Sequence, residues 1–69
     1  MLKKRSFSLS GHRTSVALEE EFWGVLDGES EATGQSLSAL VARIDLTRGE
    51  KPLASALRLR ALAVKRNNI

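Results

Sequence analysis

The sequence contains few side chains that could carry out chemistry. Cysteine is absent and His12 is the only histidine, so disulfides, thiolate metal sites and a zinc site built around this histidine are excluded. No nucleophile and buried carboxylate accompany His12 in a recognisable arrangement. We therefore predict no catalytic residue, no metal site and no cofactor, and we do not expect an enzyme. The chemistry that remains is ion pairing and hydrogen bonding by cations and hydroxyl groups.

Charged residues are segregated along the 69-residue chain, which has a net charge of +3. Four cations lie near its start: Lys3, Lys4, Arg5 and Arg13. Six acids without an intervening base lie between Glu19 and Glu31, and the end again carries cations, at Arg58, Arg60, Lys65 and Arg66. This layout indicates one surface that meets an anion and another that is a solvated helix; basic ends that only aid solubility would explain it equally well.

Two alternating segments near the start of the chain each predict a half-buried strand. Residues 6–10 alternate serine with apolar residues at odd positions, and residues 13–18 place theirs at even positions. One unbroken strand would send these two sets to opposite faces. A bulge at Gly11 would bring them together, and so would a tight hairpin turn with Gly11 at its first central position, which would pair Phe7 with Val16.

Three helices are predicted after these segments. Residues 19–21 are glutamates that suit a first helical turn, and Phe22, Val25 and Leu26 continue at helical spacing. Gly34 is a helix stop and Ser36 an N-cap for a second helix. The apolar face of that helix is Leu37, Leu40, Val41 and Ile44. After Gly49 and Pro52, a third helix has one apolar side made of Leu53, Ala56, Leu57, Ala61 and Val64, with Leu59 and Leu62 on a neighbouring side. An apolar arc this wide predicts two packing partners.

Two residues of the first predicted helix need separate comment. Trp23 lies in an otherwise apolar helical turn, so we expect it in the core or in a subunit interface and not as a platform for stacking a nucleotide. Glu29 falls at an inward position. It is either a residue at the boundary of the core or the partner of a cation from the third helix.

The order strand, helix, glycine and serine-capped helix resembles the ribbon-helix-helix family of Arc- and MetJ-like DNA-binding proteins. The segment TSVALEEEFWGVL resembles the family's strand and first helix, and TGQSLSALVARI resembles its turn and second helix. The segments GHRTSV, EFW, SLSALVARID and ASALR are similar to a bacterial subfamily of short proteins with an extra C-terminal helix. The expected fold is mainly α with a short N-terminal β segment. Residues 1–10 would form a basic arm or an extra short strand, residues 11–48 the ribbon-helix-helix core, and residues 49–69 the C-terminal helix.

The resemblance implies an intertwined homodimer, in which the strand pairs antiparallel with the same strand of a second chain. The residues that would form the dimer core are Val16, Leu18, Phe22, Trp23, Leu26, Leu40, Val41 and Ile44. The residue pattern agrees, because Val16 and Leu18 have little to cover them in one chain and an isolated pair of strands is marginal. We therefore expect stability and dimerisation to be inseparable, and the third helix is a candidate for joining dimers into higher oligomers.

The resemblance also implies a function, since a two-stranded ribbon fits the major groove of double-stranded DNA and alternate side chains then face the bases. The predicted base-reading residues are Arg13, Ser15 and Ala17, unless these form only the solvent face of a strand. Predicted phosphate contacts are the backbone amides at Ser36 and Leu37, the turn residue His12, and a flexible basic arm made of Lys3, Lys4 and Arg5.

Three function classes fit the sequence. The first is a DNA-binding transcriptional regulator, expected to act as a repressor. The second is an antitoxin, although the C-terminal segment reads as a helix and not as a disordered tail. The third is an assembly module that has lost DNA reading, which a hairpin would favour because a groove that accepts two strands would not readily admit four. No apolar run approaches the roughly 20 residues of a membrane span, so we expect no membrane partner and a cytoplasmic protein of the bacterial nucleoid.

Overall fold

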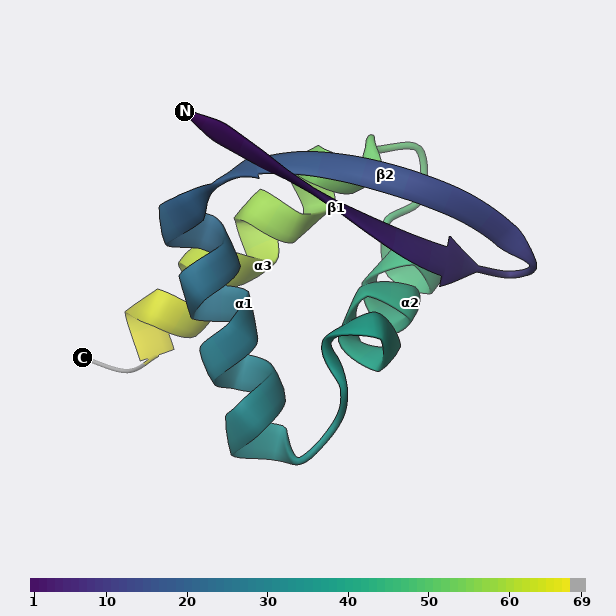
Figure 1. The fold of residues 1–69 in the computed structure, drawn as a ribbon. Coiled ribbons are helices and arrows are strands. Elements are labelled where there is room, and N and C mark those ends of the chain that lie inside the picture. Colours follow the sequence, from purple (N-terminus) through teal and green to yellow (C-terminus); the bar gives the residue numbers. More distant parts are fainter. Residues whose placement is uncertain (68–69) are drawn as a thin grey trace.

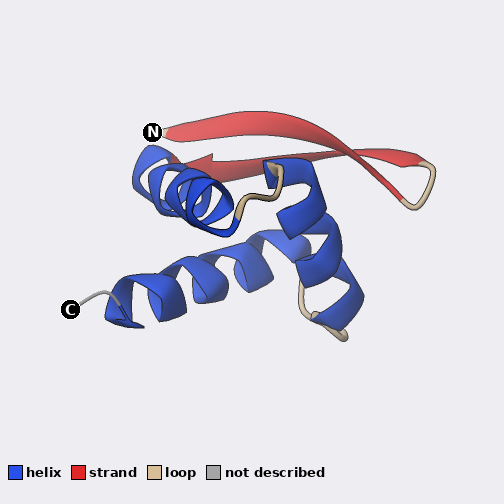
Figure 2. Ribbon diagram, turned by 90° about the horizontal axis from the view of Figure 1, so that it is seen from below, coloured by secondary structure: helices blue, strands red, loops and turns tan. Residues whose placement is uncertain are grey.

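A computed structural model describes residues 1–67 as a two-stranded antiparallel hairpin followed by three helices (Figure 1). The strands are β1 (Leu2–Leu9) and β2 (His12–Glu19), and the helices are α1 (Glu20–Thr33), α2 (Leu37–Thr47) and α3 (Leu53–Asn67). The hairpin runs along one side of the molecule and all three helices lie on the other side (Figure 2). This arrangement confirms the predicted ribbon-helix-helix fold with a third helix.

The hairpin turn consists of Ser10 and Gly11, which have φ values of 51° and 82°. Positive φ at both central positions defines a type I′ turn, whose twist matches that of the flanking strands. The predicted turn, with Gly11 in the first central position, is therefore wrong by one residue, and Phe7 lies opposite Thr14 and not Val16. The observed register engages all eight residues of both strands. Both registers keep the apolar residues on one face. Each residue of β1 has an observed partner in β2 that lies two positions from the predicted one, and residues two positions apart in a strand share a face.

Of the two forms predicted for residues 1–10, the flexible basic arm is wrong and the extra strand is observed, because β1 begins at Leu2. Two contacts tie this strand to α1. The indole Nε1 of Trp23 donates a hydrogen bond to the carbonyl oxygen of Lys3 at 2.8 Å. The guanidinium of Arg5 donates to both carboxylate oxygens of Asp27, at 2.8 and 3.1 Å, and lies 4.8 Å from the Trp23 ring centroid. The alternation of the strand therefore continues through Arg5, whose inward side chain has a partner on the helix.

The core closes within one chain. Val16 is 4% exposed and Leu18 is fully buried, so the expectation that these side chains lack cover in one chain is wrong. The physical reason is that β1 supplies the ladder for β2 while α1 and α3 pack against its inner face. Of the other residues predicted for a dimer core, four are buried and two are partly buried at the edge: Trp23, Leu26, Leu40 and Val41, then Phe22 and Ile44.

Local signals end α1 and begin α2 as predicted, whereas α1 itself begins at Glu20, because Glu19 still pairs with Leu2 in the ladder. Gly34, in the left-handed region at φ 74°, ends α1, and the Ser36 hydroxyl accepts a hydrogen bond from the amide of Ala39 at 3.1 Å to cap α2. Helix α3 packs against α1, α2 and β2. Its predicted apolar side supplies buried core residues, whereas Leu59 and Leu62 remain about half exposed. One part of the wide apolar surface of α3 is therefore buried in the core of the chain, and the other part is exposed to solvent.

Candidate nucleic-acid interface

One face of the hairpin points away from the helices and is polar. The register places Arg13 opposite Ser8, Ser15 opposite Ser6, and Ala17 opposite Lys4. Successive side chains of a strand point to opposite faces, and the intervening residues of β2, Val16 and Leu18, are buried. The hydroxyls of Ser6 and Ser15 lie 3.0 Å apart, in agreement with a shared face. We call these six residues the outward face: Lys4, Ser6, Ser8, Arg13, Ser15 and Ala17.

The outward face presents hydrogen-bond donors without a carboxylate. It carries one guanidinium, one ammonium and three hydroxyl groups, and its members are exposed apart from the half-buried Ala17. Neither Lys4 nor Arg13 takes part in the ion pairs found among residues 1–67. These two cations therefore keep their hydrogen-bonding capacity for a ligand, and guanidinium and ammonium groups are suited to phosphates and to the acceptor edge of guanine.

The structure separates the side chains that the sequence grouped as phosphate contacts. Lys4 belongs to the outward face, whereas Lys3, Arg5 and His12 alternate with its members and belong to the opposite face of the hairpin. The hydrogen bond that Arg5 donates to the Asp27 carboxylate raises the pKa of Arg5, although burial acts in the opposite direction. Arg5 is therefore engaged within the fold, and the prediction that it belongs to a mobile phosphate-binding arm is corrected. The side chains of Lys3 and His12 are exposed near the two ends of the ladder.

Sequence reasoning did not name Ser6 and Ser8 as base-reading residues, although the predicted hairpin places them on the face of Arg13, and it assigned Lys4 to the arm. The signal was present, since the serines alternate with Phe7 and Leu9. It was incomplete because only the register shows which residues of β1 lie beside Arg13, Ser15 and Ala17.

The N-terminus of α2 is a second place where an anion could bind. The Ser36 hydroxyl caps the amide of Ala39, and the Leu40 amide makes the first helical bond, to the Ser36 carbonyl at 3.0 Å. The amides of Leu37 and Ser38 precede that bond and so have no acceptor in their own helix. Such amides, at the positive end of the helix dipole, suit a phosphate oxygen.

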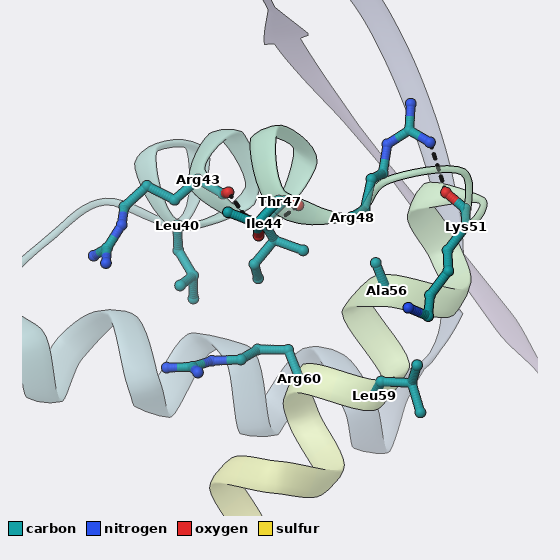
Figure 3. A pocket seen from close by; sticks show the side chains of 9 residues that line it. All are labelled: Leu40, Arg43, Ile44, Thr47, Arg48, Lys51, Ala56, Leu59 and Arg60. Atoms are coloured by element: carbon teal, nitrogen blue, oxygen red, sulfur yellow. Dashed lines mark hydrogen bonds between the residues drawn. The ribbon is translucent and has the colours of Figure 1, made fainter.

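A groove between α2 and α3 is a third surface feature (Figure 3). Leu40 and Ile44 project from α2 toward α3. The groove is lined by Leu40, Arg43, Ile44, Thr47, Arg48, Lys51, Ala56, Leu59 and Arg60. Two of its four cations form ion pairs within the chain. Arg48 donates to Asp45 and to the Lys51 carbonyl, and Arg60 donates to Glu29. Arg43 and Lys51 have no carboxylate partner among residues 1–67.

Two ion pairs join α3 to its neighbours, one to α1 and the other to β2 of the hairpin. The carboxylate of Glu29, with a side chain only 5% exposed, accepts a bifurcated hydrogen bond from the one Nε–H of Arg60, at 2.8 and 3.0 Å from its two oxygens. Glu29 is thus the partner of a third-helix cation, one of its two predicted roles. Arg58 Nε donates to Glu19 at 3.0 Å. A hydrogen bond from its own backbone amide, followed by the bond from Arg58, lowers the pKa of Glu19. These two ion pairs fix α3 against α1 and against the end of β2.

The structure shows neither a metal site nor a membrane span in the part that it describes. Residues 1–67 contain no group of three histidine, aspartate or glutamate side chains placed to hold an ion. No helix within this range has the length and apolar character needed to cross a membrane.

Comparison with known proteins agrees with the geometry of the chain. A family model described as a ribbon-helix-helix domain matches residues 2–64, a range that includes β1 and most of α3. No curated protein and no solved structure matches the chain. Since the match covers nearly all of the sequence and the strand and helices follow in the family's order, this chain belongs to the ribbon-helix-helix family.

Proposed function

We propose that this protein binds double-stranded DNA through the outward face of its hairpin and regulates transcription as a repressor. Membership of the ribbon-helix-helix family supports DNA binding in general. The observation that carries the proposal is a hairpin with one face buried on helices and an opposite face that is rich in donors. The six residues of the outward face include no carboxylate, and the carboxylate of Glu19 at the next position is bound by Arg58. The major groove admits a two-stranded ribbon, whose outward side chains then meet the base edges.

Each predicted base-reading residue has a chemically defined role in this proposal. Arg13 donates two hydrogen bonds to the O6 and N7 atoms of a guanine, Ser15 donates or accepts one, and the methyl group of Ala17 contacts a thymine methyl. Phosphate oxygens bind the free amides at the start of α2, around Ser36 and Leu37, while Lys3 adds attraction that does not depend on sequence.

The working unit in this proposal is a homodimer in the cytoplasm of a bacterium, as is usual for the family. Because the core of one chain is closed, the second chain must use surface that is still exposed. Exposed leucines are available for this on two helices, at Leu46 of α2 and at Leu59 and Leu62 of α3. Association through these side chains would leave the outward face free for DNA.

Selection of bound duplexes from a random pool, followed by titration of the preferred duplex and a scrambled one at fixed salt, tests the proposal. Arg13→Ala should weaken the preferred duplex by about 1 to 3 kcal/mol and relax the preference at its guanine. Arg66→Ala, an exposed arginine at the far end of α3, is the matched control. An equal loss on both duplexes would make Arg13 a phosphate contact. Wild-type protein that retains no duplex at low salt would refute DNA binding.

A second candidate function, protein interaction as an antitoxin or an assembly module, is favoured by the groove between α2 and α3. Its apolar floor includes Leu40 and Ile44, and its cations Arg43 and Lys51 have no carboxylate partner within residues 1–67, so the groove suits an acidic amphipathic segment of a partner. Coexpression with the products of neighbouring genes tests this function. Arg43→Glu combined with Lys51→Glu should abolish any complex formed at the groove and leave binding to DNA through the hairpin intact.

A further inference from the structure

We propose that the groove between α2 and α3 binds the exposed side of α1 from a second copy of this chain. That side, which we call the acidic face, consists of Glu20, Gly24, Gly28 and Glu31. The groove and the acidic face are different surfaces of one chain, so the contact joins chains head to tail. This inference goes beyond the proposed function, because contact between chains does not depend on binding to DNA.

The groove carries a cation at each end of an apolar strip (Figure 3). Arg43 lies at one end and Lys51 at the other, and Ile44 projects between them. Leu59 of α3 adds apolar surface that is 51% exposed. Neither Arg43 nor Lys51 forms an ion pair with another residue in the range 1–67. The groove therefore suits a segment that brings a carboxylate to each end and little bulk to the middle.

The acidic face of α1 has the chemistry that the groove requires. Glu20 and Glu31 are separated by about three helical turns, or roughly 16 Å, and so lie on the same side of the helix. Gly24 and Gly28 lie between them, and all four residues are exposed. Lys65 of α3 borders the glycines, but neither glutamate is ion-paired in the part of the chain that the structure describes. This face thus has a free carboxylate near each end and no side chain in the middle.

The fold of one chain does not explain why Gly24 and Gly28 are glycines. Glycine is less favourable than alanine in the interior of a helix, because it loses more conformational freedom on folding. A Cβ at either position would meet no atom within 4 Å, and neither residue has a positive φ. Close approach by another molecule favours glycine at such positions. In the proposed contact, Ile44 and Leu59 of a second chain occupy the space over these glycines.

The proposed contact combines charge pairs with apolar burial. Each glutamate of the acidic face lies beside one free cation of the groove, and such pairs fix the partner and its orientation. After two chains have joined, one groove and one acidic face remain unoccupied, so further chains can add until a ring closes or a filament forms. The average mass in solution should therefore rise with protein concentration. It should fall as salt screens the exposed charges.

Charge reversal on each surface tests the contact. The groove variant carries Arg43→Glu and Lys51→Glu, and the face variant carries Glu20→Lys and Glu31→Lys. Each variant alone brings like charges together and should raise the dissociation constant of self-association on the order of 10- to 100-fold. An equal mixture of the two variants restores opposite charges at every contact and should recover association. Light scattering over a range of protein concentrations at low salt measures the average mass.

Two further variants serve as controls for charge and for shape. Arg66→Glu changes an exposed arginine outside both surfaces and should leave the average mass unchanged. Gly28→Leu should raise the melting temperature at low protein concentration, since leucine favours a helix and its Cβ enters open space. It should nevertheless lower the average mass, because its side chain fills the space that the second chain needs. Circular dichroism verifies that each variant is folded.

The outcomes decide the inference without reference to DNA. An average mass of the wild-type protein that stays constant with concentration would overturn it. Reversal variants that associate as the wild type does, a mixture that remains dissociated, or a Gly28→Leu variant with undiminished association would each overturn it as well. Loss of association in each reversal variant, followed by recovery in the mixture, supports it. Since no measurement includes a duplex, failure here leaves the proposed DNA binding untouched.

Discussion

Helix α3 should contribute a large part of the free energy of unfolding, and substitution of Leu57 tests this directly. Leu57 is fully buried in the core formed with the hairpin and the other helices. Replacing such a leucine by alanine costs about 2 to 5 kcal/mol, through lost transfer energy and the cavity that remains. The total for a chain of this length is about 3 to 10 kcal/mol. Leu57→Ala should therefore remove about a fifth of the stability or more.

Leu59→Ala is the matched control, because it makes the same chemical change in the same helix at a side chain that is 51% exposed. With about half of the apolar area already in water, its expected cost is about 1 kcal/mol or less. Urea unfolding followed by circular dichroism, repeated at several protein concentrations, gives both values and detects any contribution from association. Similar losses below about 1 kcal/mol for the two variants would refute a core closed by α3.

Three further outcomes are expected from contacts in the same fold. Arg60→Ala should cost about 1 to 3 kcal/mol, since it leaves the buried Glu29 carboxylate unpaired, and a double-mutant cycle with Glu29→Gln should recover part of this in urea unfolding. Arg60 is itself half exposed, so the loss should fall below that of a fully buried pair. Because the pKa of Glu19 is lowered in the fold, its stabilising effect should be complete above the ordinary glutamate pKa and be lost as pH falls through the lowered value. Glu19→Gln should flatten this acid limb in melting temperatures measured against pH, and an unchanged limb would contradict the lowered pKa of Glu19. Ser10→Asn should raise the free energy of unfolding by up to about 1 kcal/mol, because asparagine tolerates positive φ better than serine, and a lower melting temperature would contradict the type I′ turn.

The predicted base-reading residues show what strand alternation can and cannot predict from the sequence. Alternation along β2 was enough to place Arg13 and Ser15 on the face opposite Val16 and Leu18, because neighbouring side chains of a strand point in opposite directions. Alternation continued back through Ser8 and Ser6 places Lys4 on the same face in either register. Only the observed turn decides that its cross-strand partner is Ala17, because the predicted turn would have set Glu19 opposite Lys4.

Sequence by itself determined the helices, their caps and the two faces of the hairpin, since helical spacing, Ser36, Gly34 and strand alternation act over a few neighbouring residues. Only the tertiary structure decided that β1 extends back to Leu2, that it pairs with β2 of the same chain and that one chain covers its own core. Arg5 forms an ion pair with Asp27, 22 residues away in the sequence, and Glu29 forms one with Arg60, 31 residues away. Contacts between such distant residues depend on how the elements pack together. No local period in the sequence encodes that packing.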